Sequence, residues 1–346
     1  MNKLKNSLAC ALLLGAACHA PADEYRFRLA HFWPTGSSVD QVISDWAETL
    51  HTESDGRITV DIYPAQTLAK APQSYAATVS GVADIAVTAQ GYTAGRFPLT
   101  QMIELPGIVK TAENASYVLQ GLYDESLIGN EYQDTHPLFF FAHGPGHIHT
   151  REKPVLSPDD LNGLRIRRAT TVVGELLTSL GAQPVGMPAP ETYTAAQRGV
   201  IDGVAFPWQA MKDFRLNEQL THHTAISLYT LSFITTMNSS SCERLPDDLK
   251  AVIDRNSGLN WATTMGRKLD ELDALALQEA IDSGHSIHQI EDSARNPQWQ
   301  PVLDEVIDRY IADLSAQSMP AQAVYDRARA LVDSCDTKPK TMVSRG

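Results

Sequence analysis

The chain has 346 residues, of which 43% are hydrophobic, and its 41 acidic and 28 basic side chains give a formal net charge of −13. This is the composition of a globular protein long enough for two compact domains with their own cores. The acidic balance argues against nucleic acid or an anionic membrane surface as a partner. An anionic ligand would therefore need a local cluster of basic side chains.

The N-terminus has the pattern of an export signal rather than of a folded element. Two lysines precede the apolar run LACALLLGAAC, which is far too short to cross a bilayer as a helix, and small residues follow it. We expect cleavage near Ala22, so that residues 1–22 form a signal peptide and the mature protein is periplasmic. Lipidation of Cys18 is the alternative, although Gly15 stands where a lipoprotein signal has a bulky aliphatic residue.

Two cysteines remain after removal of the signal, Cys242 and Cys335. In an oxidising compartment an isolated pair is expected to form a disulfide, which would tie the last helix to the segment after LSFITTMN. The alternative is a pair of buried free thiols.

The first half of the mature chain alternates between strand and helix patterns. Apolar residues recur with period two in the candidate strands and at helical spacing between them. The order is strand, helix, strand, helix, strand, at RFRLAHFWP, residues 39–50, RITVDIYP, residues 72–80 and DIAVTAQ. This order predicts a mostly parallel sheet with helices on its faces.

The same alternation starts afresh near residue 143. We expect second-half strands at HPLFFFAH, GLRIRRAT, AQPVGM and DGVAF, with helices between them. LYTLSFITTMN is typical of a buried strand and is expected to return to the first sheet, before a long helical pattern and two shorter helices. The predicted α/β fold has lobe I at 23–142 plus about 230–270, lobe II at 143–229 plus about 271–300, and C-terminal helices and a tail at 301–346.

A ten-residue similarity within the chain supports two similar lobes. GVADIAVTAQ and GVIDGVAFPW share a Gly-Val-x-Asp pattern after an alanine-rich helix, although a match this short could arise by chance. Ligands of open α/β sheets bind beyond the carboxyl ends of strands, so two facing lobes would place both strand ends in one cleft. The matched pairs are Gly81 with Gly199, Asp84 with Asp202, Thr88 with Phe206 and Gln90 with Trp208.

Three arginines lie close together in GLRIRRAT. Arg165 and Arg167 fall on one face of the expected strand, and Arg168 falls on the other. A guanidinium can hold a carboxylate through two parallel hydrogen bonds, which gives both affinity and orientation. The alternative is that these arginines pair with acidic residues of neighbouring helices.

The segment HGPGHIHT contains His143, His147 and His149, a pattern that zinc-dependent hydrolases also use. This segment offers no nearby carboxylate, and we expect no metal site. A histidine that donates a hydrogen bond to an anion is the favoured interpretation. No nucleophile elbow, phosphate loop or dinucleotide motif is present, so neither a catalytic site nor a cofactor is expected.

The long motif DLNGLRIRRAT…LGAQPVGMPAPETYTAAQRGVIDG resembles the hallmark of the solute-binding proteins of tripartite ATP-independent periplasmic (TRAP) transporters. SDGRITVDIYPAQTL is similar to a second family motif. The resemblance implies two α/β lobes joined by crossing strands, a long helix that spans both, and an organic acid between them. It places the carboxylate-binding arginine at Arg167 and a solvated basic residue at Arg165. It gives no account of Arg168, which stands where valine is usual.

Two departures from the family pattern bear on the ligand. His147 aligns with a second arginine of many relatives, and Phe206 aligns with an asparagine. A pocket with fewer polar groups and more aromatic surface favours an aromatic or short oxo monocarboxylate over a sugar acid. The expected ligand-binding residues are Arg167, His147, Phe206, Trp208, Gln90, Trp33 and Thr88.

The resulting hypothesis is a monomeric receptor that is not an enzyme. It would capture a small organic anion and deliver it to a TRAP membrane permease. The alternatives are a zinc-dependent periplasmic hydrolase that uses the three histidines and the binding protein of an ATP-driven importer.

Overall fold

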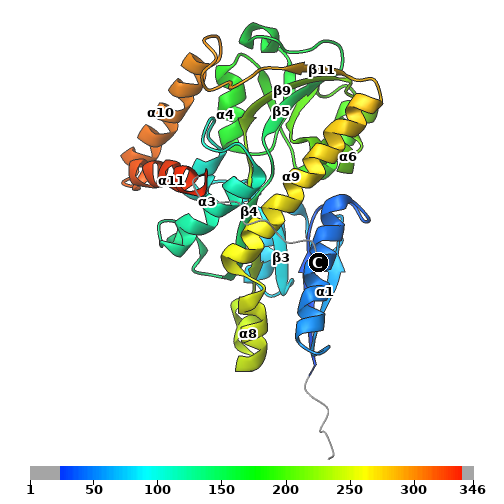
Figure 1. Ribbon diagram of the computed structural model, residues 1–346, viewed down its shortest axis with the longest axis vertical. Coiled ribbons are helices and arrows are strands. Elements are labelled where there is room, and N and C mark those ends of the chain that lie inside the picture. Colours follow the sequence, from blue (N-terminus) through cyan, green and yellow to red (C-terminus); the bar gives the residue numbers. More distant parts are fainter. Residues whose placement is uncertain (1–23, 337–346) are drawn as a thin grey trace, which may run out of the picture.

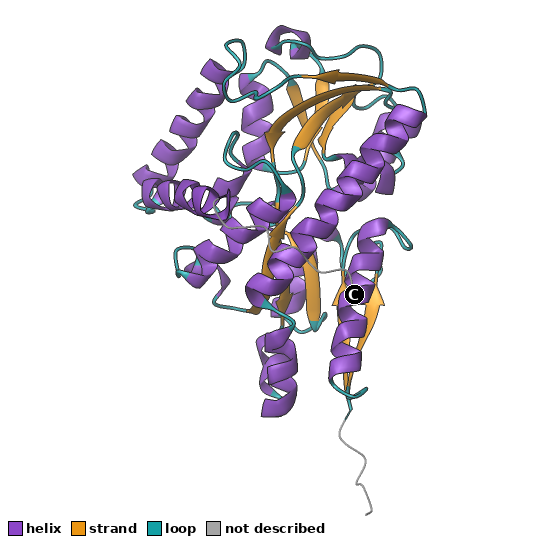
Figure 2. Cartoon of the chain, in the orientation of Figure 1, coloured by secondary structure: helices purple, strands orange, loops and turns teal. Residues whose placement is uncertain are grey.

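The computed structural model describes residues 24–336, so the expected signal peptide lies outside the described part of the chain. Two β-sheets lie one above the other, and helices cover their outer faces (Figures 1 and 2). The predicted two-lobe α/β fold is confirmed. The boundaries given above for the lobes stay a prediction.

Lobe I is built on a five-stranded sheet in which three parallel strands carry most of the expected pattern. Helix α1 (Ser38–Glu53) packs on this sheet because Val39, Ile43 and Trp46 recur on one buried face. Helices α2 (Ser74–Val79) and α3 (Ala112–Asp124) cover β3 and β4. The strands, in spatial order, are β2 (Ile58–Tyr63), β1 (Tyr25–Ala30), β3 (Ile85–Ala89), β10 (Ser232–Met237) and β4 (His136–Ala142).

Lobe II is built on a six-stranded sheet. Its strand β6, which carries the three arginines, is short, lies between β8 and the edge strand β7, and runs parallel to both. Helices α4 (Thr171–Ser179), α5 (Thr192–Gln197) and α6 (Trp208–Asp213) connect these strands or follow them. The spatial order is β11 (Ser286–Gln289), β9 (His222–Tyr229), β5 (Gly146–Thr150), β8 (Gly203–Phe206), β6 (Arg165–Arg168) and β7 (Gln183–Gly186).

Crossing strands join the lobes. The stretch predicted as one strand over LYTLSFITTMN is the end of β9 in lobe II followed by β10 in lobe I, with Thr230 and Leu231 between them. The strand expected at HPLFFFAH is β4, which belongs to the first sheet, where it pairs antiparallel with β10. The chain therefore crosses between the lobes at residues 143–145 and at Thr230 and Leu231. The two crossings are adjacent, since Thr230 donates to the backbone carbonyl of His143 at 2.6 Å.

The long helical pattern is divided into α8 (Asp247–Arg255) and α9 (Gly258–Asp282). The break falls where Gly258 has φ +61°, a value that side chains disfavour, and the carbonyl of Asn256 accepts a hydrogen bond from Trp46 Nε1 instead. Helix α9 packs on α3 and β4 of lobe I and on α6 of lobe II (Figure 1). It is the lobe-spanning helix that the family resemblance implied.

The last two helices form a second connection between the lobes. Helix α10 (Gln300–Ala316) packs on α4, and α11 (Ala321–Asp336) packs on α3. Arg309 donates to Ser179 of α4, while Tyr310 donates to the carbonyl of Pro98 in lobe I, at 2.8 Å in each case.

The internal similarity corresponds to the same local structure in each lobe. Both glycines have positive φ, +74° at Gly81 and +66° at Gly199. Asp84 accepts hydrogen bonds from the backbone and side chain of Arg28 at 2.9 and 3.0 Å. Asp202 accepts the same two bonds from Arg165 at the same distances. Arg165 is therefore not simply solvated, as expected from the family, but joins β6 to the start of β8.

Two further expectations from the sequence need correction. Cys242 is a free thiol, and the Cys335 side chain lies outside the described ones, so the structure does not support the disulfide. The Arg168 side chain, for which the family gives no account, occupies space next to two glycines that have no side chain there. A Cβ at Gly174 would lie 2.9 Å from Arg168 Cδ, and one at Gly186 would lie 2.8 Å from its Cζ.

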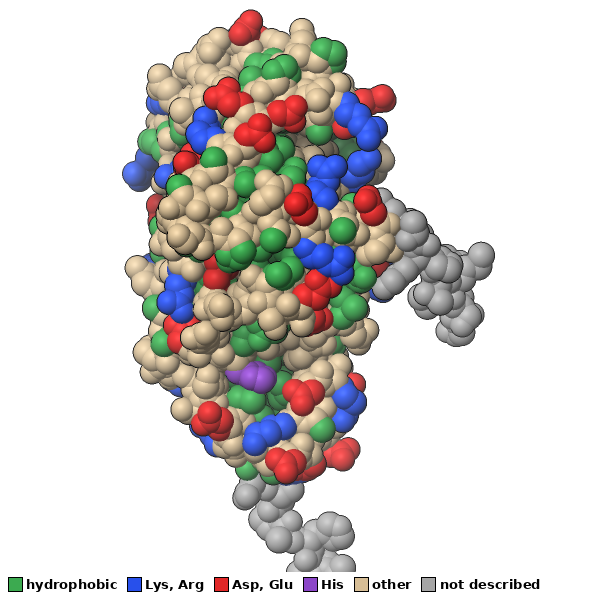
Figure 3. Space-filling model, turned by 90° about the vertical axis from the view of Figure 1, so that its left-hand side faces the viewer, with side chains coloured by type: hydrophobic (Ala, Val, Ile, Leu, Met, Phe, Trp, Pro, Cys, Tyr) green, Lys and Arg blue, Asp and Glu red, His purple; other side chains and the backbone are tan. Residues whose placement is uncertain are grey.

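Acidic and basic side chains are interspersed among uncharged ones on the face shown in Figure 3. Within residues 24–336, none of the helices has both the length and the hydropathy needed to span a bilayer.

The packing of α9 on α3 predicts that Gly266→Ala destabilises the protein. A Cβ at Gly266 would lie 2.6 Å from the carbonyl oxygen of Ala112 and 2.7 Å from Cα of Glu113, and this backbone has no room to yield. We expect the free energy of unfolding to fall by about 1–3 kcal/mol, although alanine is the better helix former. Urea denaturation followed by circular dichroism measures the change.

The matched control is Gly129→Ala, because a Cβ there meets nothing within 4 Å. This control should unfold at the urea concentration of the wild type or slightly above it. A Gly266→Ala protein as stable as the wild type would contradict the proposed close packing.

Candidate ligand-binding site

An apolar pocket lies between the two lobes, beyond the carboxyl ends of β1, β3 and β8. Lobe I supplies aromatic walls that stack on one another, with ring centroids 4.0 Å apart for Phe32 and Trp33 and 5.1 Å apart for Phe141 and Phe233. Its polar groups are few. The lining residues are Phe32, Trp33, Tyr92, Phe141, His143, Ala189, Phe206, Pro207, Gln209, Ala210, Phe214, Leu231, Phe233 and Leu269.

Arg167 borders this pocket and is completely buried. Its Nε donates to the carbonyl of Met187 at 3.1 Å, and its Nη2 donates to Tyr92 Oη at 3.3 Å. Its guanidinium carbon lies 4.3 Å from the centre of the Phe206 ring, within the range of a cation–π contact. None of the carboxylates in residues 24–336 pairs with Arg167, so its charge has only neutral partners in the described protein.

Three buried polar atoms near this charge have no hydrogen-bond partner in the described part of the protein: Arg167 Nη1, Tyr229 Oη and His143 Nε2. The rings of His143 and Tyr229 lie edge to face, 5.7 Å apart. Burial lowers the pKa of His143 to about 4, and the Arg167 charge also lowers it. Burial raises the pKa of Tyr229, while the same charge opposes that rise. Unpaired buried polar atoms are rare in folded proteins, so three of them around one buried charge make this the candidate binding site.

Tyr92 is the residue that sequence reasoning missed. It ends the short helix η2 (Gln90–Tyr92) after β3, and its hydroxyl accepts hydrogen bonds from Arg167 of lobe II and from the backbone of Ala189 at 2.9 Å. Both bonds use oxygen lone pairs, so the hydroxyl proton stays available to a ligand. The sequence feature that could have identified Tyr92 is its position just beyond a predicted strand, two residues after the predicted Gln90.

The structure brings together three of the seven predicted residues, because Trp33 and Phe206 line the pocket and Arg167 adjoins it. Gln90 instead points into lobe I and donates to Tyr132 Oη at 3.2 Å, and Thr88 is buried within β3. The binding roles of these residues stay predictions.

His147 and Trp208 are not among the lining residues of the pocket. His147 Nδ1 accepts two backbone hydrogen bonds, from Ile226 and Ser227, at 3.1 Å each. Trp208 packs against His147, His149 and the small residues of α9. The donation of a hydrogen bond from His147 to the ligand stays a prediction, with only its second ring nitrogen available for it.

The three histidines of HGPGHIHT each contact different partners. His143 Nδ1 contacts the carbonyl of Gly144, His147 binds the β9 backbone, and His149 contacts His223 at 2.7 Å and the carbonyl of Phe206 at 3.0 Å. No group of three potential ligands in residues 24–336 is arranged to hold a metal ion. The zinc hydrolase considered from the sequence therefore has no ligand set among the described side chains.

The lobes also touch outside the pocket. The buried carboxylate of Glu104, in lobe I, accepts hydrogen bonds from Thr170 of lobe II at 2.7 Å and from Ser232 at 3.0 Å, and burial raises its pKa to about 7. Asp213, at the end of α6, accepts hydrogen bonds from Ser38 and from the backbone of Val39 at the start of α1. An acidic residue of lobe II thus caps a helix of lobe I.

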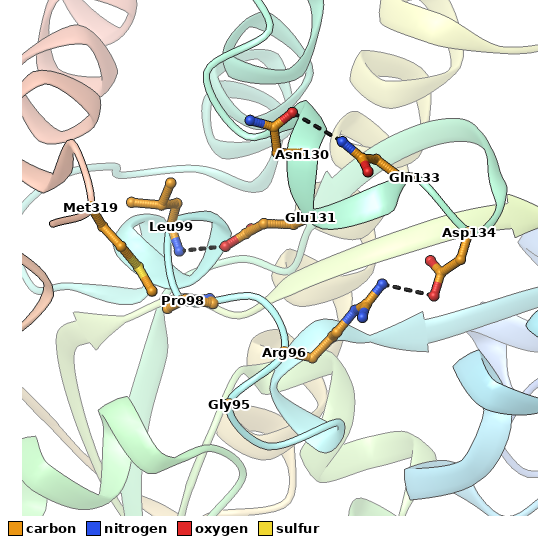
Figure 4. Close-up of a pocket in the computed structure, with 9 residues that line it drawn as sticks. All are labelled: Gly95, Arg96, Pro98, Leu99, Asn130, Glu131, Gln133, Asp134 and Met319. Carbon is orange, nitrogen blue, oxygen red and sulfur yellow. Dashed lines mark hydrogen bonds and ion pairs between the residues drawn. The ribbon is translucent and has the colours of Figure 1, made fainter. Parts of the chain in front are cut away.

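A second hollow, of about 600 Å³, shares no lining residue with the first (Figure 4). Its polar groups are mostly engaged with one another. Arg96 pairs with Asp134 at 2.7 Å, Glu131 accepts from the backbone of Leu99 at 2.8 Å, and Gln133 donates to Asn130 at 3.2 Å. The pocket between the lobes, with its unpaired donors, is therefore the candidate site.

The known proteins that this chain resembles are solute-binding proteins. The family model of bacterial extracellular solute-binding protein, family 7, matches residues 29–313. A TRAP solute-binding protein from a marine metagenome, specific for aromatic acid ligands and crystallised with 3-hydroxybenzoate, is 35% identical. Its alignment covers 91% of this chain and all of that one, with a TM-score of 0.88.

Two further relatives are similar over most of their length. The TRAP solute-binding protein of Rhodoferax ferrireducens, solved with copurified benzoate, is 33% identical over 90% of this chain and 98% of that one, with a TM-score of 0.87. The C4-dicarboxylate-binding periplasmic protein of Rhodobacter capsulatus is 26% identical over 90% of this chain and 94% of its own. The chain therefore belongs to family 7 of the bacterial extracellular solute-binding proteins, the solute-binding proteins of TRAP transporters.

Proposed function

We propose that this protein is a periplasmic receptor that binds a small aromatic monocarboxylate between its lobes and delivers it to a TRAP membrane permease. The observation that carries the proposal is Arg167, a completely buried guanidinium without an acidic partner in the described protein. A buried charge is strongly destabilising unless it is paired. A ligand carboxylate supplies that pairing.

The pocket walls favour an aromatic ligand. Seven phenylalanine, tryptophan and tyrosine side chains, together with leucine and proline, line it, and only His143 and Gln209 add further polar side chains. A sugar acid would lose the hydrogen bonds of its hydroxyl groups against such walls. Relatives that are 33% and 35% identical were crystallised with benzoate and 3-hydroxybenzoate, which have this combination of an apolar ring and one carboxylate.

Closure of the lobes over the ligand is the proposed motion. Tyr92 contacts Arg167 across the cleft, and Asp213 caps α1 across it, so these bonds exist only when the lobes are together. A ligand held by both lobes binds the closed form better and increases its population. The closed surface is then what the permease recognises.

The remaining parts of the proposal follow from the sequence and the family. The expected signal peptide, residues 1–22, would export the chain, and the mature receptor would act as a monomer without a cofactor or catalytic group. Membership of the TRAP family favours this role over the binding protein of an ATP-driven importer.

Arg167→Met tests the proposal directly. Methionine fills similar space without charge, so we expect benzoate binding to weaken by about 10²-fold or more, because the carboxylate loses its partner. Stability without ligand should be equal to the wild type or higher, since an unpaired buried cation is removed. Isothermal titration calorimetry with benzoate and thermal unfolding measure the two effects.

Arg165→Met is the matched control on the same strand. Arg165 is paired with Asp202 and is half-exposed, so its loss should lower stability slightly and leave the affinity for benzoate unchanged. Equal benzoate affinity in Arg167→Met and the wild type would refute the proposed role of Arg167.

Asp213→Ala tests lobe closure. Asp213 does not line the pocket, yet its carboxylate caps α1 of the opposite lobe. Loss of a helix cap is worth about 0.5–2 kcal/mol, so we expect benzoate affinity to fall by a factor of about 2 to 30. Calorimetry gives the affinity, and small-angle scattering should still show compaction at saturating benzoate.

Ser37→Ala is the control for this variant. The Ser37 hydroxyl caps the same helix from within lobe I, where it accepts a hydrogen bond from the backbone of Asp40. Its removal should lower stability without changing affinity. If Asp213→Ala binds benzoate like the wild type, the contact between Asp213 and α1 has no part in closure.

A further inference from the structure

His143 is a polar group of the pocket that a carboxylate does not satisfy. It follows directly on β4, lines the pocket and is 5% exposed. Thr230 donates to its backbone carbonyl at 2.6 Å, and its ring lies between those of Tyr229 and Phe233, with centroids 5.7 and 5.8 Å away. The imidazole is therefore fixed in place at the pocket wall.

The hydrogen bonds of His143 determine which of its nitrogens carries the proton. Nδ1 contacts the carbonyl oxygen of Gly144, and a carbonyl can only accept, so Nδ1 is the donor. Burial lowers the pKa of His143 to about 4, which leaves the ring neutral at neutral pH. Nε2 is then a bare acceptor, buried and without a partner in residues 24–336.

The available polar atoms around Arg167 can each donate a hydrogen bond. Arg167 Nη1 and the hydroxyl protons of Tyr92 and Tyr229 all suit a carboxylate, which only accepts hydrogen bonds. A carboxylate therefore cannot satisfy His143 Nε2. A buried acceptor left without a donor is destabilising, so the ligand itself is expected to supply one.

We propose that His143 Nε2 accepts a hydrogen bond from a hydroxyl group of the ligand, and that the physiological ligand is a hydroxylated aromatic carboxylate. This inference rests on the proposed function, since it assumes that Arg167 holds the carboxylate. It makes His143 the residue that distinguishes hydroxylated acids from unsubstituted ones. The hydroxyl belongs either to the ring, as in 3-hydroxybenzoate, or to the carbon beside the carboxylate, as in mandelate.

The test measures calorimetric affinities of the wild type for two pairs of acids. The first pair is 3-hydroxybenzoate and benzoate, and the second is mandelate and phenylacetate. We expect the hydroxylated member of one pair to bind at least about tenfold more tightly, because sites built to bind a hydroxyl reject analogues without it. The pair that shows the preference locates the hydroxyl. No preference in either pair would overturn the inference.

His143→Phe keeps a ring at this position but removes the acceptor. In this variant the preference should fall to about one, because the hydroxyl group of the ligand loses its acceptor. Tyr229→Phe is the matched control, because it removes a neighbouring hydroxyl donor. That control should weaken both members of a pair alike and leave their ratio unchanged. A His143→Phe protein that keeps the wild-type preference would overturn the inference.

If His143→Phe does not fold, 3-fluorobenzoate and 2-fluoro-2-phenylacetate on the wild type serve the same purpose, since fluorine is close to a hydroxyl in size but donates nothing. Each should bind no better than its unsubstituted parent; binding as tight as that of the hydroxylated acid would overturn the inference. A wild type that binds none of these acids would instead refute the proposed function itself, which keeps the two failures distinguishable.

Discussion

A buried arginine without an acidic partner is the constraint on which the rest of this structure depends. Arg167 lies on a short strand next to the sheet edge. In residues 24–336 its charge meets a carbonyl, a hydroxyl and the face of an aromatic ring, and no carboxylate. Replacing such a group by an apolar one often stabilises a protein. In the proposed function its presence is explained by an anion that binds from solution and is enclosed when the lobes meet, so that ligand binding and domain closure would depend on the same guanidinium.

The framework that holds this arginine is repeated in both lobes. In each, an aspartate at the start of a strand binds the backbone and side chain of an arginine on the neighbouring strand, after a glycine of positive φ. In lobe II that pairing fixes Arg165, and because side chains alternate along a strand, Arg167 then projects from the same face one pleat nearer the cleft. In lobe I the equivalent strand leads to Trp33. The repeated framework therefore positions a charged side chain of lobe II and an aromatic side chain of lobe I at the same pocket.

Periodicity and one long motif predicted the two-lobe fold, because both are local features of the sequence. The same motif singled out Arg167, which the structure places beside the pocket, while its role in binding stays a prediction. The sequence did not predict contacts set by the end of a strand. Thr88 and Gln90 were placed in the pocket by analogy with Phe206 and Trp208, but β3 turns into a short helix that sends Gln90 towards Tyr132 and presents Tyr92 instead. Trp208 packs instead against Ala276 and Ala280 of α9, which are far away in sequence. Likewise, the acceptor character of His143 depends on a carbonyl contact that no sequence pattern reveals.

The proposed function depends on the charge of the ligand, and a neutral analogue of the same shape tests this most directly. Benzamide matches benzoate in size and ring but cannot neutralise Arg167, and its NH₂ group would face the guanidinium donors. Calorimetric titration of the wild-type protein with both compounds should give an affinity for benzamide weaker than that for benzoate by about 10²-fold or more. Equal affinities for the two would contradict the claim that an unpaired Arg167 is the centre of the site.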